Sequence, residues 1–213
     1  MNSKLYDFDL PEHVLILNDW AHQSAVSWSA LWSHADGYNL GRSMLINGKG
    51  FMNNPEYAYP ADVPKSSVKT PLAHVMVQPN KRYRFRLIDI SIYYSSKRFS
   101  IEGHNLTVIS INGNPIEPVE VESIILQSGE RYDFVLNTKS EPKNAFIYLH
   151  AVTDICYVFQ IYQAAELIYE GAKNVLNISE TSYMGAQRMG KSLKSFADPI
   201  SSNEDIHLTD LKA

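Results

Sequence analysis

Alternation of apolar and polar residues, interrupted by tight turns, is the feature that most constrains what this chain can fold into. In KRYRFRLIDI, Tyr83, Phe85 and Leu87 alternate with arginines, and LTVISI and RYDFVLN continue the pattern. A period of two is typical of strands with one face against a core. Asn112-Gly113 and Ser128-Gly129 supply turns between these runs. Short strands joined in this way predict an all-β sandwich or barrel.

Other apolar runs predict further strands. They are HVLILNDW (13–20), SMLIN (43–47), FSIEG (99–103), VEVESIILQ (119–127), AFIYLHAV (145–152) and YVFQIYQAAELIYEG (157–171). Residues 21–37 carry alanines and tryptophans at helical spacing, which predicts one short helix that ends at Asp36-Gly37. Residues 50–70 contain three prolines and no periodicity, so we expect a loop there.

The domain limits follow from where this patterning begins and fades. The chain of 213 residues can form one large domain or two small ones. After Gly171 the sequence becomes polar and rich in Ser and Lys. We therefore predict a linker at 1–12, a β domain at 13–171 and a linker or tail at 172–213. Within the tail, a last strand is expected near Ile206.

Charge and hydropathy exclude several classes of partner. The formal net charge is -4, and the lysines and arginines form no dense cluster, so we expect no nucleic-acid partner. No apolar run is long enough to span a membrane. The N-terminal MNSKLYDFDLPEH has no apolar core of a signal peptide, so we expect no signal peptide in this chain.

The segment SIEGHNLTVISINGNPIEP, from Ser100 to Pro118, contains the first candidates for chemistry. Glu102 and His104 could be a catalytic pair or metal ligands, or they could be framework residues. Metal sites need convergent ligands, and none of the seven histidines forms a His-x-His or HExxH motif. We therefore expect structural or surface roles for the histidines, with no catalytic and no metal-binding residue in this chain.

The single cysteine, Cys156, raises the question of a blue-copper site. Such a site joins a cysteine to two histidines and a weak axial ligand, and a histidine follows the cysteine within a few residues. Here the next histidine is His207, and only His150 lies shortly before the cysteine. We therefore predict no copper site at Cys156. A lone cysteine fits either a reducing compartment or a secreted fragment whose partner cysteine lies elsewhere.

Charged residues on the predicted strands have two interpretations. The acidic set could hold paired catalytic carboxylates, and the arginine set could bind an anion. We favour a solvated sheet face on which the two sets pair with each other. The sets are Glu120, Glu122, Glu130 and Asp133, and Arg82, Arg84 and Arg86.

Two N-glycosylation triplets begin at Asn105 and Asn177, and they matter only if the chain is secreted.

Several segments in a fixed order resemble one family. They are LYDFDLPEHVLILNDWAHQ, SMLINGKGF, KRYRFRLIDI, the run from Phe99 to Asn137, and FQIYQAAELIYEGA. The ordered set covers almost the whole chain and resembles the second domain of laccase-type multicopper oxidases, with its last segment most like arthropod laccases. The first segment looks like the junction with a first domain, and the terminal DIHLTDLKA looks like the linker to a third.

The resemblance implies a Greek-key, cupredoxin-like β-sandwich for this chain. It also implies a parent enzyme of three such sandwiches, which oxidises phenolic substrates and reduces dioxygen to water. In that family copper is bound by His-x-His motifs of the first domain and by His-rich and His-Cys-His motifs of the third, and none of these occurs here. We therefore expect copper in the full-length family and none bound by this chain alone. Its partners would be the first and third cupredoxin domains.

The sequence departs from the family in one loop and leaves one cysteine without a partner. Fungal relatives carry a substrate-contacting carboxylate in the loop that here reads SIYYSSKR, so Tyr93, Tyr94 and Ser95 become the substrate-pocket candidates. The family's cysteine near position 156 implies a disulfide partner outside this chain. Family resemblance also implies an extracellular, secreted protein.

Three hypotheses for function follow. The first is a non-catalytic central domain that spaces the copper domains and helps to wall the substrate pocket. The second is a stand-alone cupredoxin-like module that binds a partner without redox activity. The third is a complete small enzyme, which the missing ligand clusters disfavour. Whether the chain itself is an enzyme therefore stays open at this point.

Overall fold

The computed structural model describes residues 4–21, 24, 26, 29–30, 33, 43–52, 70–92, 96–152, 161–183, 191–194, 205–207 and 210–212. The strands are β1 Val14–Trp20, β2 Ser43–Ile46, β3 His74–Val77, β4 Arg82–Asp89, β5 Ser96–Ile101, β6 Leu106–Ile111, β7 Asn114–Val121, β8 Ser123–Gln127, β9 Arg131–Asn137, β10 Ala145–Ala151, β11 Tyr162–Tyr169, β12 Ser192–Lys194 and β13 Ile206–His207. Short 3₁₀ turns lie at η1 Pro11–His13 and η3 Ile178–Glu180.

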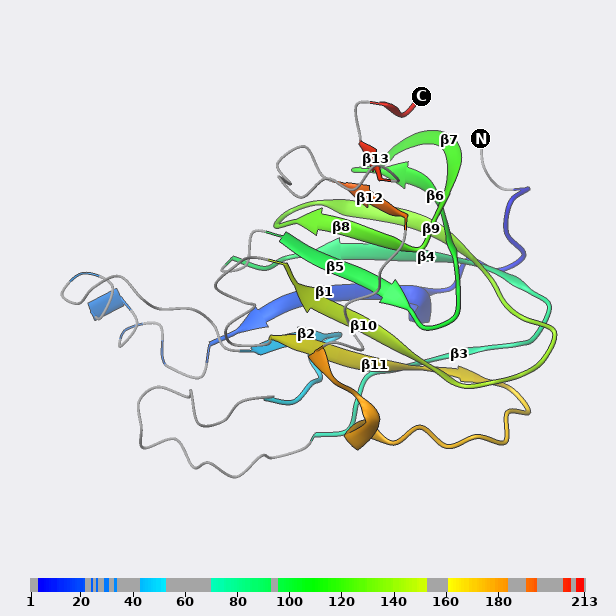
Figure 1. Cartoon of the computed structure of the whole chain (residues 1–213). Helices are drawn as coiled ribbons and strands as arrows, with labels where there is room; N and C mark the ends of the chain where they lie inside the picture. The colour runs from blue at the N-terminus through cyan, green and yellow to red at the C-terminus, as the bar shows by residue number, and fades with distance from the viewer. Residues whose placement is uncertain are drawn as a thin grey trace.

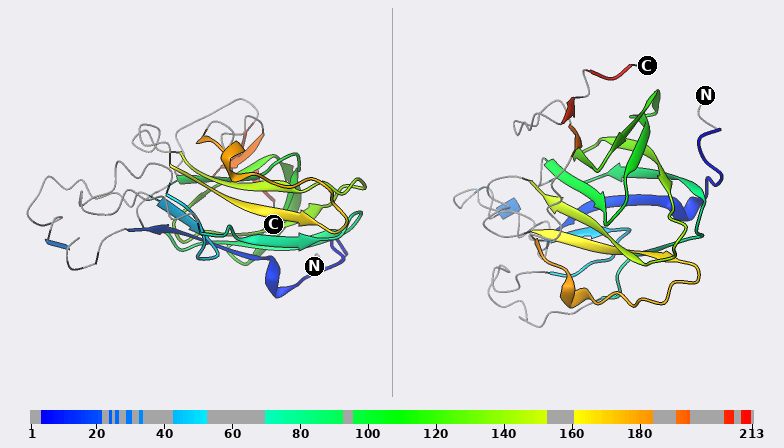
Figure 2. Two further views of the ribbon diagram at one scale, coloured as in Figure 1. Left: turned by 90° about the horizontal axis from the view of Figure 1, so that it is seen from below. Right: turned by 45° about the vertical axis from the view of Figure 1, so that its right-hand side comes forward.

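The strands form two sheets that pack as layers of a sandwich (Figures 1 and 2). The first sheet has the order β2-β1-β4-β9-β6-β7, and the second has the order β13-β12-β8-β5-β10-β11-β3. Most neighbours are antiparallel, but β1 lies parallel to β4 and β3 lies parallel to β11. The prediction of an all-β sandwich is therefore confirmed.

The core forms where the inward faces of the sheets meet. On β4, Tyr83, Phe85 and Leu87 are buried, as their alternation predicted. Phe85 stacks on Phe134 of the neighbouring β9 with ring centroids 5.2 Å apart. Phe99 of the opposite sheet lies 5.6 Å from the same ring. Aromatic rings from both layers thus interlock, which joins the two sheets into one core.

The predicted strands are present, with one important correction. VEVESIILQ is not one strand, because the chain changes sheets at Glu122. Before it, β7 is largely exposed and pairs with β6; after it, β8 is buried and pairs with β5. Sandwich corners are commonly made by strands that switch sheets. The alternation of apolar and polar residues does not show where such a switch occurs. Strand β3 was not predicted at all.

The remaining local predictions have mixed outcomes. Asn112 and Gly113 both have positive φ, 51° and 86°, which confirms the tight hairpin between β6 and β7. The strand expected near Ile206 is present as β13. The predicted helix at 21–37 and the loop at 50–70 lie mostly outside the described residues. Where the helix is described, the Ser33 hydroxyl donates to the Ser29 carbonyl at 2.9 Å.

The N-terminal segment lies along β4 before β1 begins. The Phe8 ring stacks on Tyr83 at 5.0 Å, and the Arg84 amide donates to the Phe8 carbonyl at 2.9 Å. Asp9 forms ion pairs with Arg84 and Arg86 at 3.0 and 2.5 Å. The described residues before Pro11 are therefore held against the first sheet.

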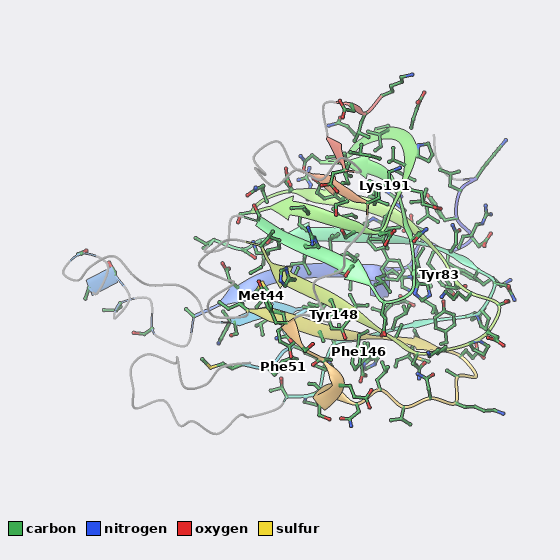
Figure 3. All side chains as sticks on the ribbon, in the orientation of Figure 1. Met44, Phe51, Tyr83, Phe146, Tyr148 and Lys191 are labelled. Carbon is green, nitrogen blue, oxygen red and sulfur yellow. The ribbon has the colours of Figure 1, made fainter. Side chains whose placement is uncertain are left out.

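The segment after β11 covers part of the outer face of the second sheet. Asn144 and Asn174 exchange side-chain and backbone hydrogen bonds of 2.8–3.0 Å, which fixes the start of this segment. Leu176 and Ile178 then pack on a small buried cluster outside the main core (Figure 3). The cluster consists of Leu72, Phe146, Tyr148 and Ala164.

Beyond η3, strand β12 extends the second sheet beside β8. The Lys191 carbonyl accepts from the amide of Glu122 at 2.8 Å, at the point where the chain changes sheets. The buried hydroxyls of Ser123 and Ser192 lie 2.7 Å apart. This part of the polar C-terminal region is therefore paired with the sandwich.

A buried glutamine links the β2 hairpin of the first sheet to β11 of the second. Gln163 is fully buried, and its amide nitrogen donates to the carbonyls of Met44 at 2.7 Å and Phe51 at 3.0 Å. Met44 and Phe51 are labelled in Figure 3. The approach is close at Gly50, where an added Cβ would lie 2.2 Å from the Gln163 amide nitrogen and 2.9 Å from the Met44 carbonyl. Only glycine fits there without movement.

We predict that Gly50→Ala destabilises the fold. The new methyl overlaps both a buried side chain and a backbone oxygen, and overpacking of this kind costs about 1–3 kcal/mol. The free energy of unfolding, measured by urea titration at neutral pH, is the readout. A value equal to that of the parent chain would show that the hairpin shifts to make room.

Candidate functional site

The candidate site is the end of the sandwich where β4 passes into β5. The predicted pocket residues Tyr93, Tyr94 and Ser95 lie outside the described residues, but their flanks are described. On one side, the Ile92 amide donates to both carboxylate oxygens of Asp19, each at 3.0 Å. On the other, the Gln127 side chain donates to the Ser96 hydroxyl at 2.8 Å. Polar contacts therefore fix both approaches to residues 93–95.

A buried ion pair joins the sheets next to this loop. The Lys97 ammonium lies 3.0 Å from the Asp89 carboxylate, and both side chains are fully buried. The other Asp89 oxygen accepts from the Ser91 amide at 2.9 Å. Asp89 and Lys97 are the last inward positions of β4 and the first of β5, so the pair closes the core at this end. Sequence reasoning missed it, although Lys97 is in phase with the inward-facing Phe99 and Ile101.

His150 lies near the same end, on the outer side of the second sheet. It is 2% exposed and stands opposite Arg98 on β5, and its ring is 4.3 Å from that of Tyr183. Neither ring nitrogen has a hydrogen-bond partner in the described part of the chain. Burial, together with the charge of Arg98, lowers the pKa of His150 to about 4. The imidazole is therefore neutral at neutral pH.

Glu102 and His104, the two candidates of the SIEGH segment, are both bonded to other residues of the fold. His104 Nδ1 lies 2.7 Å from the Glu102 carbonyl, so it is the protonated nitrogen, and Nε2 accepts from the Tyr169 hydroxyl at 2.6 Å. The Glu102 carboxylate accepts from the Phe146 amide at 3.3 Å. Both imidazole nitrogens are thus committed to protein groups, and neither offers a lone pair to a metal. These contacts support the framework interpretation.

The arginine face of β4 is paired, as we expected, but mostly with different acids. Arg84 forms an ion pair with Asp133 at 2.5 Å, which confirms that part of the prediction. Arg82 pairs with Asp7 at 2.8 Å and Arg86 with Asp9, and both acids come from the N-terminal segment. This pairing could not be predicted from the sequence, because the N-terminal segment is distant in the chain and lies beside β4 only in the folded state.

No metal site is evident among the described residues. No three side chains of His, Cys, Asp or Glu converge within them. His13 is buried and lies 3.2 Å from the Met76 carbonyl. Cys156 lies outside the described residues. That this chain binds no copper therefore stays a prediction from its sequence.

The two glycosylation triplets occupy different surroundings. Asn105 is exposed just before β6, and its side-chain nitrogen donates to Glu120 at 3.1 Å. Asn177 is exposed before η3.

Within the described ranges, no helix is long and apolar enough to cross a membrane.

We predict that the Asp89–Lys97 pair is coupled. Lys97→Met leaves an unpaired carboxylate in the core, which should destabilise the chain by about 3–5 kcal/mol. The double variant Asp89→Asn, Lys97→Met removes both charges and keeps an acceptor for Ser91, so it should recover much of that loss. Urea unfolding of the parent, both single variants and the double variant gives the coupling energy; additive losses would contradict a direct pair.

We further predict an acid-dependent loss of stability at His150. The folded-state pKa of about 4 lies below the usual 6.5. The unfolded chain therefore binds a proton first as the pH falls from about 6.5 toward 4. The loss should reach about 3 kcal/mol across that window. His150→Phe removes the titrating group, so its unfolding free energy should fall less than the parent's between pH 7 and pH 4.5. Equal falls in both proteins would rule out His150 as the cause.

Comparisons with known proteins point to one family. The family model described as Multicopper oxidase matches residues 11–172. Laccase-1 of Pleurotus ostreatus is 40% identical over 144 residues, which cover 67% of this chain and 23% of that protein. Laccase-5 of Trametes villosa is 36% identical over 146 residues, which cover 68% of this chain and 24% of that protein. The chain thus spans about a quarter of the length of these relatives.

Solved structures share the fold. The laccase from Botrytis aclada aligns with a TM-score of 0.59 and 22% identity, covering 83% of this chain and 31% of that one. Fet3p, a multicopper oxidase that functions in iron import, aligns with a TM-score of 0.57 and 20% identity, covering 82% and 31%. At these identities the likeness shows the fold alone, and it agrees with a cupredoxin-like β-sandwich. Because the family model covers more than half of the sequence, this chain belongs to the multicopper oxidase family.

Proposed function

We propose that this chain is the second, central domain of a laccase-type multicopper oxidase. The family match over residues 11–172 carries the proposal, together with a sequence that contains no His-x-His or His-Cys-His motif. In the proposed parent enzyme, phenolic substrates are oxidised and dioxygen is reduced to water by copper held in other domains. The reported curated relatives are fungal, and the arthropod-like character of the last segment stays a prediction.

In this proposal the chain acts by holding the neighbouring domains in place. Residues 13–171 form the domain, and 1–12 and 172–213 connect it to the first and third cupredoxin domains. The described parts of both connections contact the sandwich, which supports a fixed spacing between neighbours. Family membership also supports an extracellular location for the parent.

The same proposal assigns the substrate wall to the loop between β4 and β5. Tyr93, Tyr94 and Ser95 are the candidates, because they stand where fungal relatives carry a substrate-contacting carboxylate. Two phenolic rings and a hydroxyl would offer stacking and hydrogen bonding to a phenolic substrate without a carboxylate.

A second candidate function is a stand-alone binding module without redox activity. Exposed apolar side chains on and beside the β1–β4 side of the first sheet favour it. They are Ile16, Trp20, Ile90 and Ile92, with exposed fractions of 39%, 52%, 58% and 79%. Exposed apolar groups of this kind often mark contact surfaces. In the first proposal, the same side chains would meet another domain.

The test is to purify the chain, incubate it with Cu(II) and remove unbound metal by gel filtration. We expect no stoichiometric copper by mass spectrometry, no blue absorbance and no oxidation of a phenolic substrate, because the ligand motifs are missing. Stoichiometric blue copper would overturn the central-domain proposal.

Sequencing of the reading frame on both sides separates the two candidates. In-frame His-Trp-His upstream and His-Cys-His downstream support the central domain of an oxidase. A stop codon before either motif would favour the stand-alone module. Sedimentation velocity of the isolated chain adds a second readout, since an apolar face without its partner should promote self-association.

A further inference from the structure

We propose that Asn177 is an N-glycosylation site that takes an oligosaccharide when the chain enters a secretory compartment. For the natural protein, the inference rests on the secretion included in the proposed function. The observations behind it concern the triplet Asn177-Ile178-Ser179, which neither the core nor the copper chemistry of the family accounts for.

The middle residue of this triplet is partly buried, and the residues on either side of it are exposed. Asn177 and Ser179 are exposed, whereas Ile178 between them is half-buried against the cluster of Phe146 and Tyr148. The middle residue therefore holds the segment on the second sheet while its neighbours face solvent. A sugar attached to Asn177 would extend into water and displace no packed side chain.

The carboxamide of Asn177 presents its nitrogen to solvent. Its oxygen accepts from the Ser179 amide at 3.1 Å and from the Ser179 hydroxyl at 2.7 Å. Because an amide is planar and its nitrogen lies opposite its oxygen, these two bonds direct Nδ2 away from the turn. Nδ2 makes no hydrogen bond to the described residues. Attachment at that atom therefore breaks no contact of the folded chain.

The required chemistry is a balanced group transfer. A lipid-pyrophosphate-linked oligosaccharide is the donor, and an oligosaccharyltransferase of the secretory pathway is the catalyst. The bond between the anomeric carbon and Asn177 Nδ2 forms, and the bond from that carbon to the pyrophosphate oxygen breaks. The amide nitrogen loses one proton, the lipid pyrophosphate leaves, and no atom is oxidised or reduced.

Asn105 provides an internal contrast. Its Nδ2 donates to the Glu120 carboxylate at 3.1 Å, so attachment there must alter an existing hydrogen bond. Leu106 is fully buried, and Thr107 lies in β6 between β7 and β9. The folded structure therefore accommodates a glycan at Asn177 with less rearrangement than at Asn105.

A glycan at Asn177 would also orient the domain. The triplet lies over the outer side of the second sheet, whereas Ile16 is exposed on the outer side of the first. Figure 1 shows η3 below β11 and away from β1. A solvated oligosaccharide over the second sheet leaves the outer side of the first sheet, where Ile16 and Trp20 are exposed, as the one available for a neighbouring domain.

The experiment is secretion of the full chain from yeast behind a leader supplied by the host. The key variant is Asn105→Gln, which leaves Asn177 in the only remaining triplet. We expect its intact mass to exceed the polypeptide mass by one oligosaccharide. After peptide-N-glycosidase F it should fall to the mass of the polypeptide with one aspartate in place of asparagine. Ser179→Ala in the Asn105→Gln background should abolish the added mass, and Ser179→Thr should retain it.

An Asn105→Gln chain secreted at its bare polypeptide mass overturns the proposal. If this variant is not secreted, the parent chain is deglycosylated in H₂¹⁸O and mapped by peptide mass spectrometry. Labelled aspartate at position 177 then supports the site, and unlabelled asparagine there overturns it. Because the host supplies the leader and copper plays no part, the result is independent of the copper test above.

Discussion

The burial of two inward sheet faces against each other is the constraint on which the rest of this structure depends. Phe85 and Phe134 of one sheet meet Phe99 of the other, and β4 sends every second side chain into this layer. These contacts across the layer hold the two sheets together as one core. In our proposal, a sandwich joined in this way holds the neighbouring domains at a fixed spacing.

Several buried polar groups lie at the end of the sandwich between β4 and β5. Asp89 and Lys97 are both fully buried, and His150 is buried without a hydrogen-bond partner among the described residues. Removing such groups from water destabilises the folded state unless they are paired, so the contacts that stabilise them depend on one another. The same end carries the loop that we propose as the substrate wall. The described residues on both sides of that loop are therefore among the most constrained of the sandwich.

The strands were largely predictable, because a period of two reflects one buried face and turn dipeptides mark where strands end. The sheet change at Glu122 was not, since alternation says which face is buried and not which sheet a strand joins. The partners of Arg82 and Arg86 were also missed, because Asp7 and Asp9 reach β4 only through the fold. Lys97 could have been noticed, as a charge in phase with Phe99 and Ile101.

The sequence by itself determined the fold class, the ordered segments that identify the family, and the absence of its copper-ligand motifs. These features depend on local spacing, which the chain carries without folding. Only the tertiary structure decided that His104 is bonded through both nitrogens, that Asp89 faces Lys97, and that Ile178 packs on the second sheet beside the exposed Asn177. Each of these depends on residues far apart in the chain, or on which side chains are buried, and both follow from how the two sheets pack.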